Sequence, residues 1–197
     1  MPYFNIVAET SENTVVTEYE PVKKRSDSYQ SEAALEQEFI RLLCEQGYEY
    51  LPIHTEKDLI ANLRKKLEEL NNYQFSDTEW DDFFKNAVAN PNEHIVEKTR
   101  KMQEDNVQVL TRDDGSSKNI TLIDKKNIHN NRLQVINQYA VSTDDGAKHD
   151  NRYDVTVLVN GLPLVHIELK RRGVAIREAF NQINRYQRES FGAGSGL

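Results

Sequence analysis

Cysteine is almost absent from this chain of 197 residues, with Cys44 as its single representative. One cysteine excludes an intramolecular disulfide framework and argues against a zinc site built from thiolates. Cys44 falls within an apolar pattern of helical period, so we expect it to be a buried, small hydrophobic side chain.

Long hydrophobic runs are missing as well. No apolar stretch approaches the roughly 20 residues of a membrane span, and the start, Met1 to Asn5, lacks the basic and apolar regions of a signal peptide. We therefore expect a cytoplasmic protein with no membrane partner. A Gly-x₄-Gly-Lys-Ser/Thr phosphate loop is also lacking, so these residues are not expected to hydrolyse ATP.

An overall positive charge, common in proteins that hold nucleic acid by bulk electrostatics, is lacking too, since the net charge is −7. The distribution qualifies this, because residues 151–197 hold seven basic side chains against four acidic ones. The composition, 38% hydrophobic and 29% charged, is that of a globular chain, and the length suits one domain.

Apolar residues of helical period fill the first half, where we expect helices over about 31–46, 55–70, 76–88 and 92–101. Ser31 is a good N-cap for the first, whose expected core face is Leu35, Phe39, Leu42 and Leu43. The second half alternates like strands over 107–112, 119–124, 133–139, 153–159 and 163–170, followed by a helix from 175 to about 190. The sequence thus predicts an α/β fold, mainly helical over about 1–105, with a sheet and a final helix over about 106–191.

The strands 153–159 and 163–170 flank Asn160-Gly161, a strong hairpin signal. Because side chains alternate along a strand, Glu168 and Lys170 share one face of the second strand. A two-residue turn places Asp154 opposite Ile167, whereas an odd-length loop brings it onto the face of Glu168. We therefore predict a three-residue loop, with a two-residue turn acceptable only if a bulge compensates.

Two converging carboxylates repel each other and attract a cation. Oxygen ligands select Mg²⁺ or Mn²⁺ over zinc, and such an ion can lower the pKa of a bound water. Lys170 can orient that water and offset phosphate charge. Asp154, Glu168 and Lys170 are thus the candidate catalytic residues for phosphodiester hydrolysis, with the two acids as metal ligands.

The final helix carries Gln182 and Tyr186, which lie four residues apart and therefore on one face. Their amide and hydroxyl groups are candidates for positioning DNA or water, and Arg185 and Arg188 for contacting the DNA backbone. Solvated or core-rim side chains are the alternative for both polar residues.

Several plainer readings stay open. Asp154, Glu168 and Lys170 can form a structural salt bridge, and a similar spacing recurs where Asp113 or Asp114 precedes Asp124-Lys125-Lys126. His166 is expected to be a structural histidine rather than a catalytic base. Glu32, Glu36 and Glu38 suit the start of their helix, although one of them, Glu32 first, is a candidate for the metal site.

These residues resemble a known family. Tyr153-Asp154, Ile167-Glu168-Leu169-Lys170 and Gln182-x₃-Tyr186 resemble the P-D…(D/E)-x-K nucleases of the RecB-like branch. The longer runs 151–165 and 173–183, with 28–32 and 122–127, resemble the restriction subunit of type I restriction–modification enzymes. Tyr153 departs from the pattern, which has proline before the aspartate.

The resemblance implies a restriction-endonuclease-like core, in which a mixed sheet is flanked by helices and carries an N-terminal helical elaboration. It implies Mg²⁺-dependent endonucleolytic cleavage of double-stranded DNA, in a complex with methyltransferase and specificity subunits. Cleavage would follow ATP-driven translocation by a motor region that these 197 residues do not include, so the chain is expected to be an N-terminal fragment. The alternatives are a non-catalytic assembly module and a stand-alone nuclease of repair or recombination.

Overall fold

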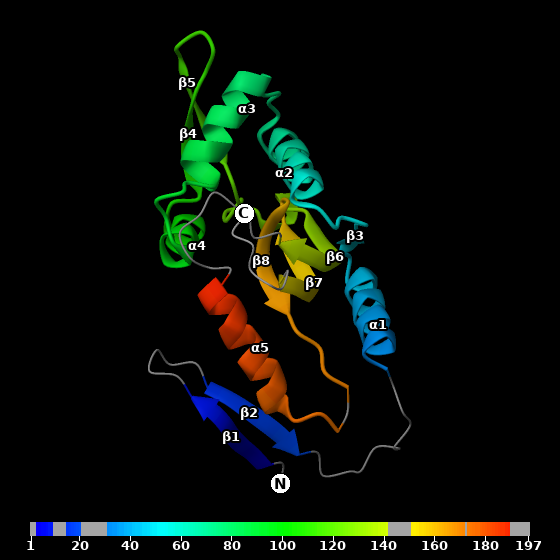
Figure 1. The fold of residues 1–197 in the computed structure, drawn as a ribbon. Coiled ribbons are helices and arrows are strands. Elements are labelled where there is room, and N and C mark those ends of the chain that lie inside the picture. The colour runs from blue at the N-terminus through cyan, green and yellow to red at the C-terminus, as the bar shows by residue number, and fades with distance from the viewer. Residues whose placement is uncertain (1–2, 10–14, 21–30, 142–150, 172, 190–197) are drawn as a thin grey trace.

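A computed structural model of the chain describes residues 3–9, 15–20, 31–141, 151–171 and 173–189 (Figure 1). The helices are α1 (Glu32–Glu45), α2 (Glu56–Asn71), α3 (Asp77–Phe83), the π-helical turn η1 (Phe84–Val88), α4 (Ile95–Glu104), the 3₁₀ turn η2 (Ile128–Asn130) and α5 (Ile176–Glu189). The strands are β1 (Tyr3–Glu9), β2 (Val15–Glu20), β3 (Glu49–Tyr50), β4 (Val107–Thr111), β5 (Ser117–Thr121), β6 (Leu133–Val141), β7 (Asn151–Val159) and β8 (Leu162–Ile167).

A four-stranded mixed sheet of order β3-β6-β7-β8 occupies the centre of the molecule. β3 runs parallel to β6, and the other neighbours are antiparallel. Two further hairpins, β1–β2 and β4–β5, lie at opposite ends of the molecule (Figure 1). The predicted α/β class with a mixed sheet and helices is confirmed, whereas the restriction-endonuclease-like core stays a prediction.

The helices α1, α2 and α3 begin where the sequence predicts because hydroxyl side chains cap them, whereas α4 begins at Ile95 and not at about residue 92. Ser31 accepts a hydrogen bond from the Ala34 amide at 3.1 Å, and Thr55 accepts one from the Asp58 amide at 3.2 Å. Ser76 and Glu79 form a complete capping box at the start of α3. None of the described helices combines the length and apolar character that crossing a membrane requires.

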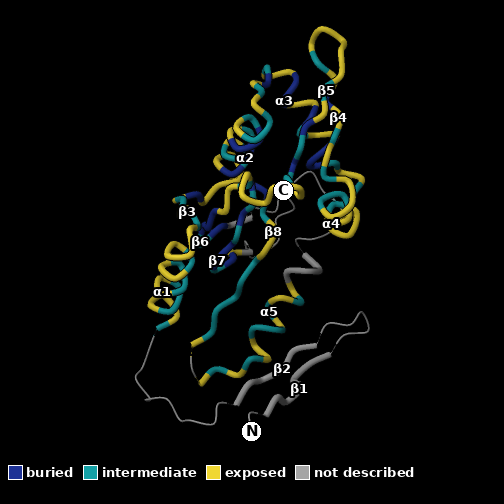
Figure 2. Tube along the Cα trace, turned by 180° about the vertical axis from the view of Figure 1, so that it is seen from behind, coloured by how far each residue is buried: buried dark blue, intermediate teal, exposed yellow. Residues whose placement is uncertain are grey.

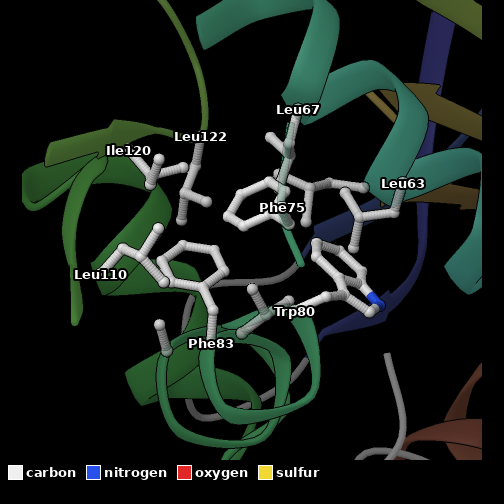
Figure 3. Close-up of a cluster of buried hydrophobic side chains, with 11 residues drawn as sticks. Leu63, Leu67, Phe75, Trp80, Phe83, Leu110, Ile120 and Leu122 are labelled. Atoms are coloured by element: carbon white, nitrogen blue, oxygen red, sulfur yellow. The ribbon is translucent and has the colours of Figure 1, made fainter. Parts of the chain in front are cut away.

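The main core joins α2, α3 and the β4–β5 hairpin (Figure 3). Leu63 and Leu67 of α2 pack there with Phe75, Trp80 and Phe83, and the Phe75 ring stacks on Phe83 at 5.6 Å. A second cluster lies between the start of α2 and the sheet and consists of Ile53, Leu59, Ile136, Tyr139, Tyr153 and Leu158. α2 therefore fixes the sheet to the helical half.

α1 differs from its prediction. None of its residues, all of which are described, is buried, and Leu42 is 41% exposed (Figure 2). Cys44, predicted to be buried, is exposed. The physical reason is that α1 lies at the side of the sheet, against β3 and β7, where polar contacts described below hold it.

The β7–β8 turn corrects another expectation. The loop has two residues, not three, because Val159 pairs with Leu162. Asn160 and Gly161 adopt φ values of 52° and 84°, the left-handed pair of a tight hairpin. The buried Asn160 side chain holds this turn by donating to the Leu122 carbonyl at 3.0 Å and accepting from the Arg132 amide at 2.8 Å.

A bulge in β8 restores the register that the longer loop was expected to give. Leu158 pairs with Pro163 but Val157 with Val165, so Leu164 is the additional residue. Proline has no N–H to donate to the ladder, which suits a position beside a bulge. From Val157 toward Asp154, every residue of β7 therefore pairs with a residue of β8 one position further along than the two-residue turn alone would give.

Candidate active site

Asp154 and Glu168 face each other at the ends of β7 and β8. Val155 pairs with Ile167, so the next residues along the two strands, Asp154 and Glu168, come opposite one another. β8 ends at Ile167, before the two site residues, and not at Lys170 as predicted. The Asp154 carboxylate holds the segment that follows β8, because its Oδ2 accepts a hydrogen bond from the Leu169 amide at 2.9 Å.

Lys170 completes the cluster. Its Nζ lies 2.5 Å from Oε1 of Glu168, and the side chains of Glu168 and Lys170 are only 3% and 19% exposed. This ion pair shows that the two side chains lie on the same side of the segment that follows β8. The structure thus brings Asp154, Glu168 and Lys170 together.

The electrostatics of this cluster follow from its burial. Burial is the main reason why the pKa of Glu168 is raised; the ion pair with Lys170 opposes the change, and the charge of Asp154 adds to it. Burial alone would lower the pKa of Lys170, but Glu168, Glu32 and Asp154 together raise it. Lys170 is therefore an ammonium ion at neutral pH, and its single charge offsets one of the two adjacent acids.

The donor set fits a hard divalent cation. Among the described residues, no three or more His, Cys, Asp or Glu side chains form a ready metal-binding group. Mg²⁺ is, however, commonly held by one or two carboxylates, with water and substrate phosphate as the other ligands. Asp154 and Glu168 supply such a pair, and their mutual repulsion favours a cation between them.

Glu32 reaches the same region from α1. Its Oε1 accepts a hydrogen bond from the Arg171 amide at 3.4 Å, and its charge acts on the neighbouring Lys170. Glu36, one turn further, instead binds side chains of β6, and Glu38 pairs with Arg41 on the exposed face. Of the three acids, Glu32 is the one placed at the cluster.

His166 has the surroundings of a structural residue. Burial lowers the pKa of its imidazole to about 4, so the ring is neutral at pH 7. Its Nδ1 lies 2.9 Å from Oγ1 of Thr156, and the ring stacks on Tyr153 with centroids 4.1 Å apart. These contacts favour the structural reading over the catalytic one.

The predicted helix behind the hairpin is α5, which lies beside β1. Gln182 is half-buried on it and Arg185 is exposed. The side chains of Tyr186 and Arg188 lie outside the described residues. The roles of these four residues in positioning DNA or water stay predictions.

The structure separates the residues of the similar spacing found in the sequence, in which Asp113 or Asp114 precedes Asp124-Lys125-Lys126. Asp113 and Asp114 occupy the tip of the β4–β5 hairpin, whereas Asp124 follows β5 at its other end. Asp124 accepts hydrogen bonds from the amides of Lys126 and Asn127 at 3.0 and 2.9 Å, which accounts for it as a turn residue.

Comparison with known proteins decides the family. A sequence model described as "Type I restriction enzyme R protein N terminus" matches residues 29–197. The chain belongs to this family. The resemblance predicted from the sequence is thereby confirmed.

Curated members of the family are similar over most of the chain. The Type I restriction enzyme EcoprrI endonuclease subunit of Escherichia coli is 49% identical over 192 residues, which cover 97% of this chain and 60% of that protein. The SsaAORF53P endonuclease subunit of Staphylococcus saprophyticus is 40% identical over 83% of this chain and 17% of its own length. The HindI endonuclease subunit of Haemophilus influenzae is 30% identical over 81% of this chain, again 17% of its own length. The chain therefore spans only part of each relative.

Three features beside the site were not read from the sequence. Thr156 partners His166, Glu36 binds two amide side chains of β6, and Gln138 has a positive φ of 53°. Glutamine, unlike glycine or asparagine, does not indicate a left-handed backbone, so the sequence does not predict this conformation at Gln138.

Proposed function

We propose that this chain is the nuclease region of a type I restriction subunit and that it cleaves double-stranded DNA with the help of Mg²⁺. The observation that supports this most is the convergence of Asp154, Glu168 and Lys170 at the ends of β7 and β8. A purely structural ion pair needs only Glu168 and Lys170. The additional acid, Asp154, adds repulsion between carboxylates, and a bound cation would offset that repulsion.

Each residue has a distinct role in the proposed reaction. Asp154 and Glu168 would hold the metal ion, which when bound lowers the pKa of a water molecule and neutralises phosphate charge. Through its Nζ, Lys170 would orient the attacking water or donate a hydrogen bond to a phosphate oxygen. Leu169 holds the Asp154 carboxylate in place through its amide.

The wider assignment follows the family. We propose that residues 1–197 act as one endonuclease domain with a restriction-endonuclease-like core. It would work in a complex with methyltransferase and specificity subunits, in the cytoplasm, where an ATP-driven motor region translocates DNA before cleavage. Gln182 and Tyr186 are proposed to position DNA or water.

The proposal is tested in a complete restriction complex whose restriction subunit carries this chain. Lys170→Ala should reduce double-strand cleavage by at least about 100-fold, the typical effect of removing a charge-stabilising donor. ATP-driven translocation should stay at the parental rate. Lys65→Ala, which removes an equal charge from the exposed face of α2, is the matched control and should cleave normally. Parental cleavage by the Lys170 variant would show that the cluster is structural.

A further inference from the structure

Gln138 stands directly opposite Asp154 on the neighbouring strand. Asn137 pairs with Val155 and Tyr139 with Tyr153, which brackets Gln138 and Asp154 as the intervening pair. At this point the backbone of Gln138 has a φ of 53°, in the left-handed region that L-residues other than Asn and Asp seldom adopt. An unfavourable conformation persists only where its surroundings hold it.

The surroundings that hold it are supplied by α1. Glu36 accepts a hydrogen bond from Nδ2 of Asn137 at 2.6 Å with one carboxylate oxygen, and one from Nε2 of Gln138 with the other. Consecutive side chains of a regular strand point to opposite faces. A single carboxylate can bind both amides because the left-handed residue breaks the alternation.

Asn137, one of the two residues that Glu36 binds, is also held by residues outside α1. Oδ1 of Asn137 accepts a hydrogen bond from the Tyr50 hydroxyl at 3.0 Å, and the Asn137 carbonyl lies 3.2 Å from Nδ1 of His54. From α1, Glu36 binds β6 on one side, and Glu32 accepts a hydrogen bond from the Arg171 amide beyond the end of β8 on the other. α1 is thus fixed to both sides of the acidic cluster.

We infer that Glu36 is a positioning residue for the candidate metal site: it holds Gln138 in its left-handed conformation, and through this strand position it sets the orientation of the Asp154 carboxylate. This inference rests on the proposed function for its purpose, though the structural coupling is independent of it. Glu36 acts here through its hydrogen bonds to Asn137 and Gln138.

The test uses the 197-residue chain and two readouts. The first is hydrogen exchange of the Leu169 amide, which reports the orientation of Asp154 without any metal. The second is the dissociation constant for Mn²⁺, measured by calorimetry. Glu36→Ala should speed exchange at Leu169 by about 10-fold or more and weaken Mn²⁺ binding by about 10- to 100-fold, the usual effect of losing an outer contact of a metal site. Glu38→Ala, which removes an equal charge from the exposed face of α1, should leave both values within about 2-fold.

A double variant tests the mechanism. Glycine adopts a left-handed backbone without steric cost, so Gln138→Gly combined with Glu36→Ala should recover most of the protection at Leu169. Equal impairment of the double and the single variant would overturn the inference, as would an effect of Glu36→Ala no larger than that of Glu38→Ala. If Glu36→Ala does not fold, Glu36→Gln replaces it, because glutamine keeps the volume and one acceptor and should show an intermediate loss. Failure of the parent chain to bind Mn²⁺ would contradict the proposed function, while exchange at Leu169 would still decide the role of Glu36.

Discussion

Replacing Gly161 by alanine tests how the hairpin turn that sets the site is held. The residue has a φ of 84°, and a Cβ there would lie 2.6 Å from Cα and 2.9 Å from N of Leu63. These are backbone atoms of α2, so no side-chain rotation relieves the overlap. The left-handed backbone costs an L-residue about 1–2 kcal/mol, and overpacking a close contact typically costs about 1–3 kcal/mol more.

The sum, about 2–5 kcal/mol, corresponds to a fall in Tm on the order of 10 °C for a chain of this size. Gly115 is the matched control, because its φ is 79° but a Cβ there would meet nothing within 4 Å. Gly115→Ala should therefore cost only the backbone part. Thermal and urea unfolding followed by circular dichroism measures both variants. Equal losses of stability would refute the contact between the turn and α2.

Two further predictions concern titratable groups. Native His166, with a pKa of about 4, stays neutral while the unfolded chain takes up a proton near pH 6.5. The free energy of unfolding should therefore keep its full value above pH 6.5 and fall by up to about 3 kcal/mol as the pH drops toward 4. Urea unfolding at several pH values should show this slope in the parent chain and a smaller one in His166→Gln, and identical slopes would contradict the prediction. Asp154→Asn removes a negative charge beside Glu168, so the pKa of Glu168, measured by NMR titration of its side-chain carboxyl carbon, should be lower than in the parent chain. Asp82→Asn, far from the cluster on α3, should leave that pKa unchanged. An unchanged pKa in Asp154→Asn would show that the two acids do not interact.

Local chemistry explains what the sequence predicts well. The leucines at 59, 63 and 67 have a helical period and are fully buried, and the caps at Ser31, Thr55 and Ser76 begin their helices as expected. The register that brings Asp154 opposite Glu168 was also predictable, because valines had to share one face. These features depend on residues close together in the chain.

The errors arise where distant residues decide. The turn has two residues because Asn160 is held by Leu122 and Arg132, which are remote in sequence, and the register shift moves to the bulge at Leu164. Cys44 is exposed because α1 lies at the side of the sheet, where Glu36 binds side chains of β6 and no residue of the helix is fully buried. Neither outcome can be read from the local pattern of the segment concerned.

Asp154 and Glu168 are proposed to hold a divalent cation beside Lys170. The most direct measurement is anomalous diffraction from a crystal of this chain soaked in Mn²⁺. We expect a peak between the two carboxylates, with Nζ of Lys170 released from its 2.5 Å contact with Glu168, and no such peak in Asp154→Asn. Absence of a peak at saturating Mn²⁺, with the ion pair between Glu168 and Lys170 intact, would contradict it.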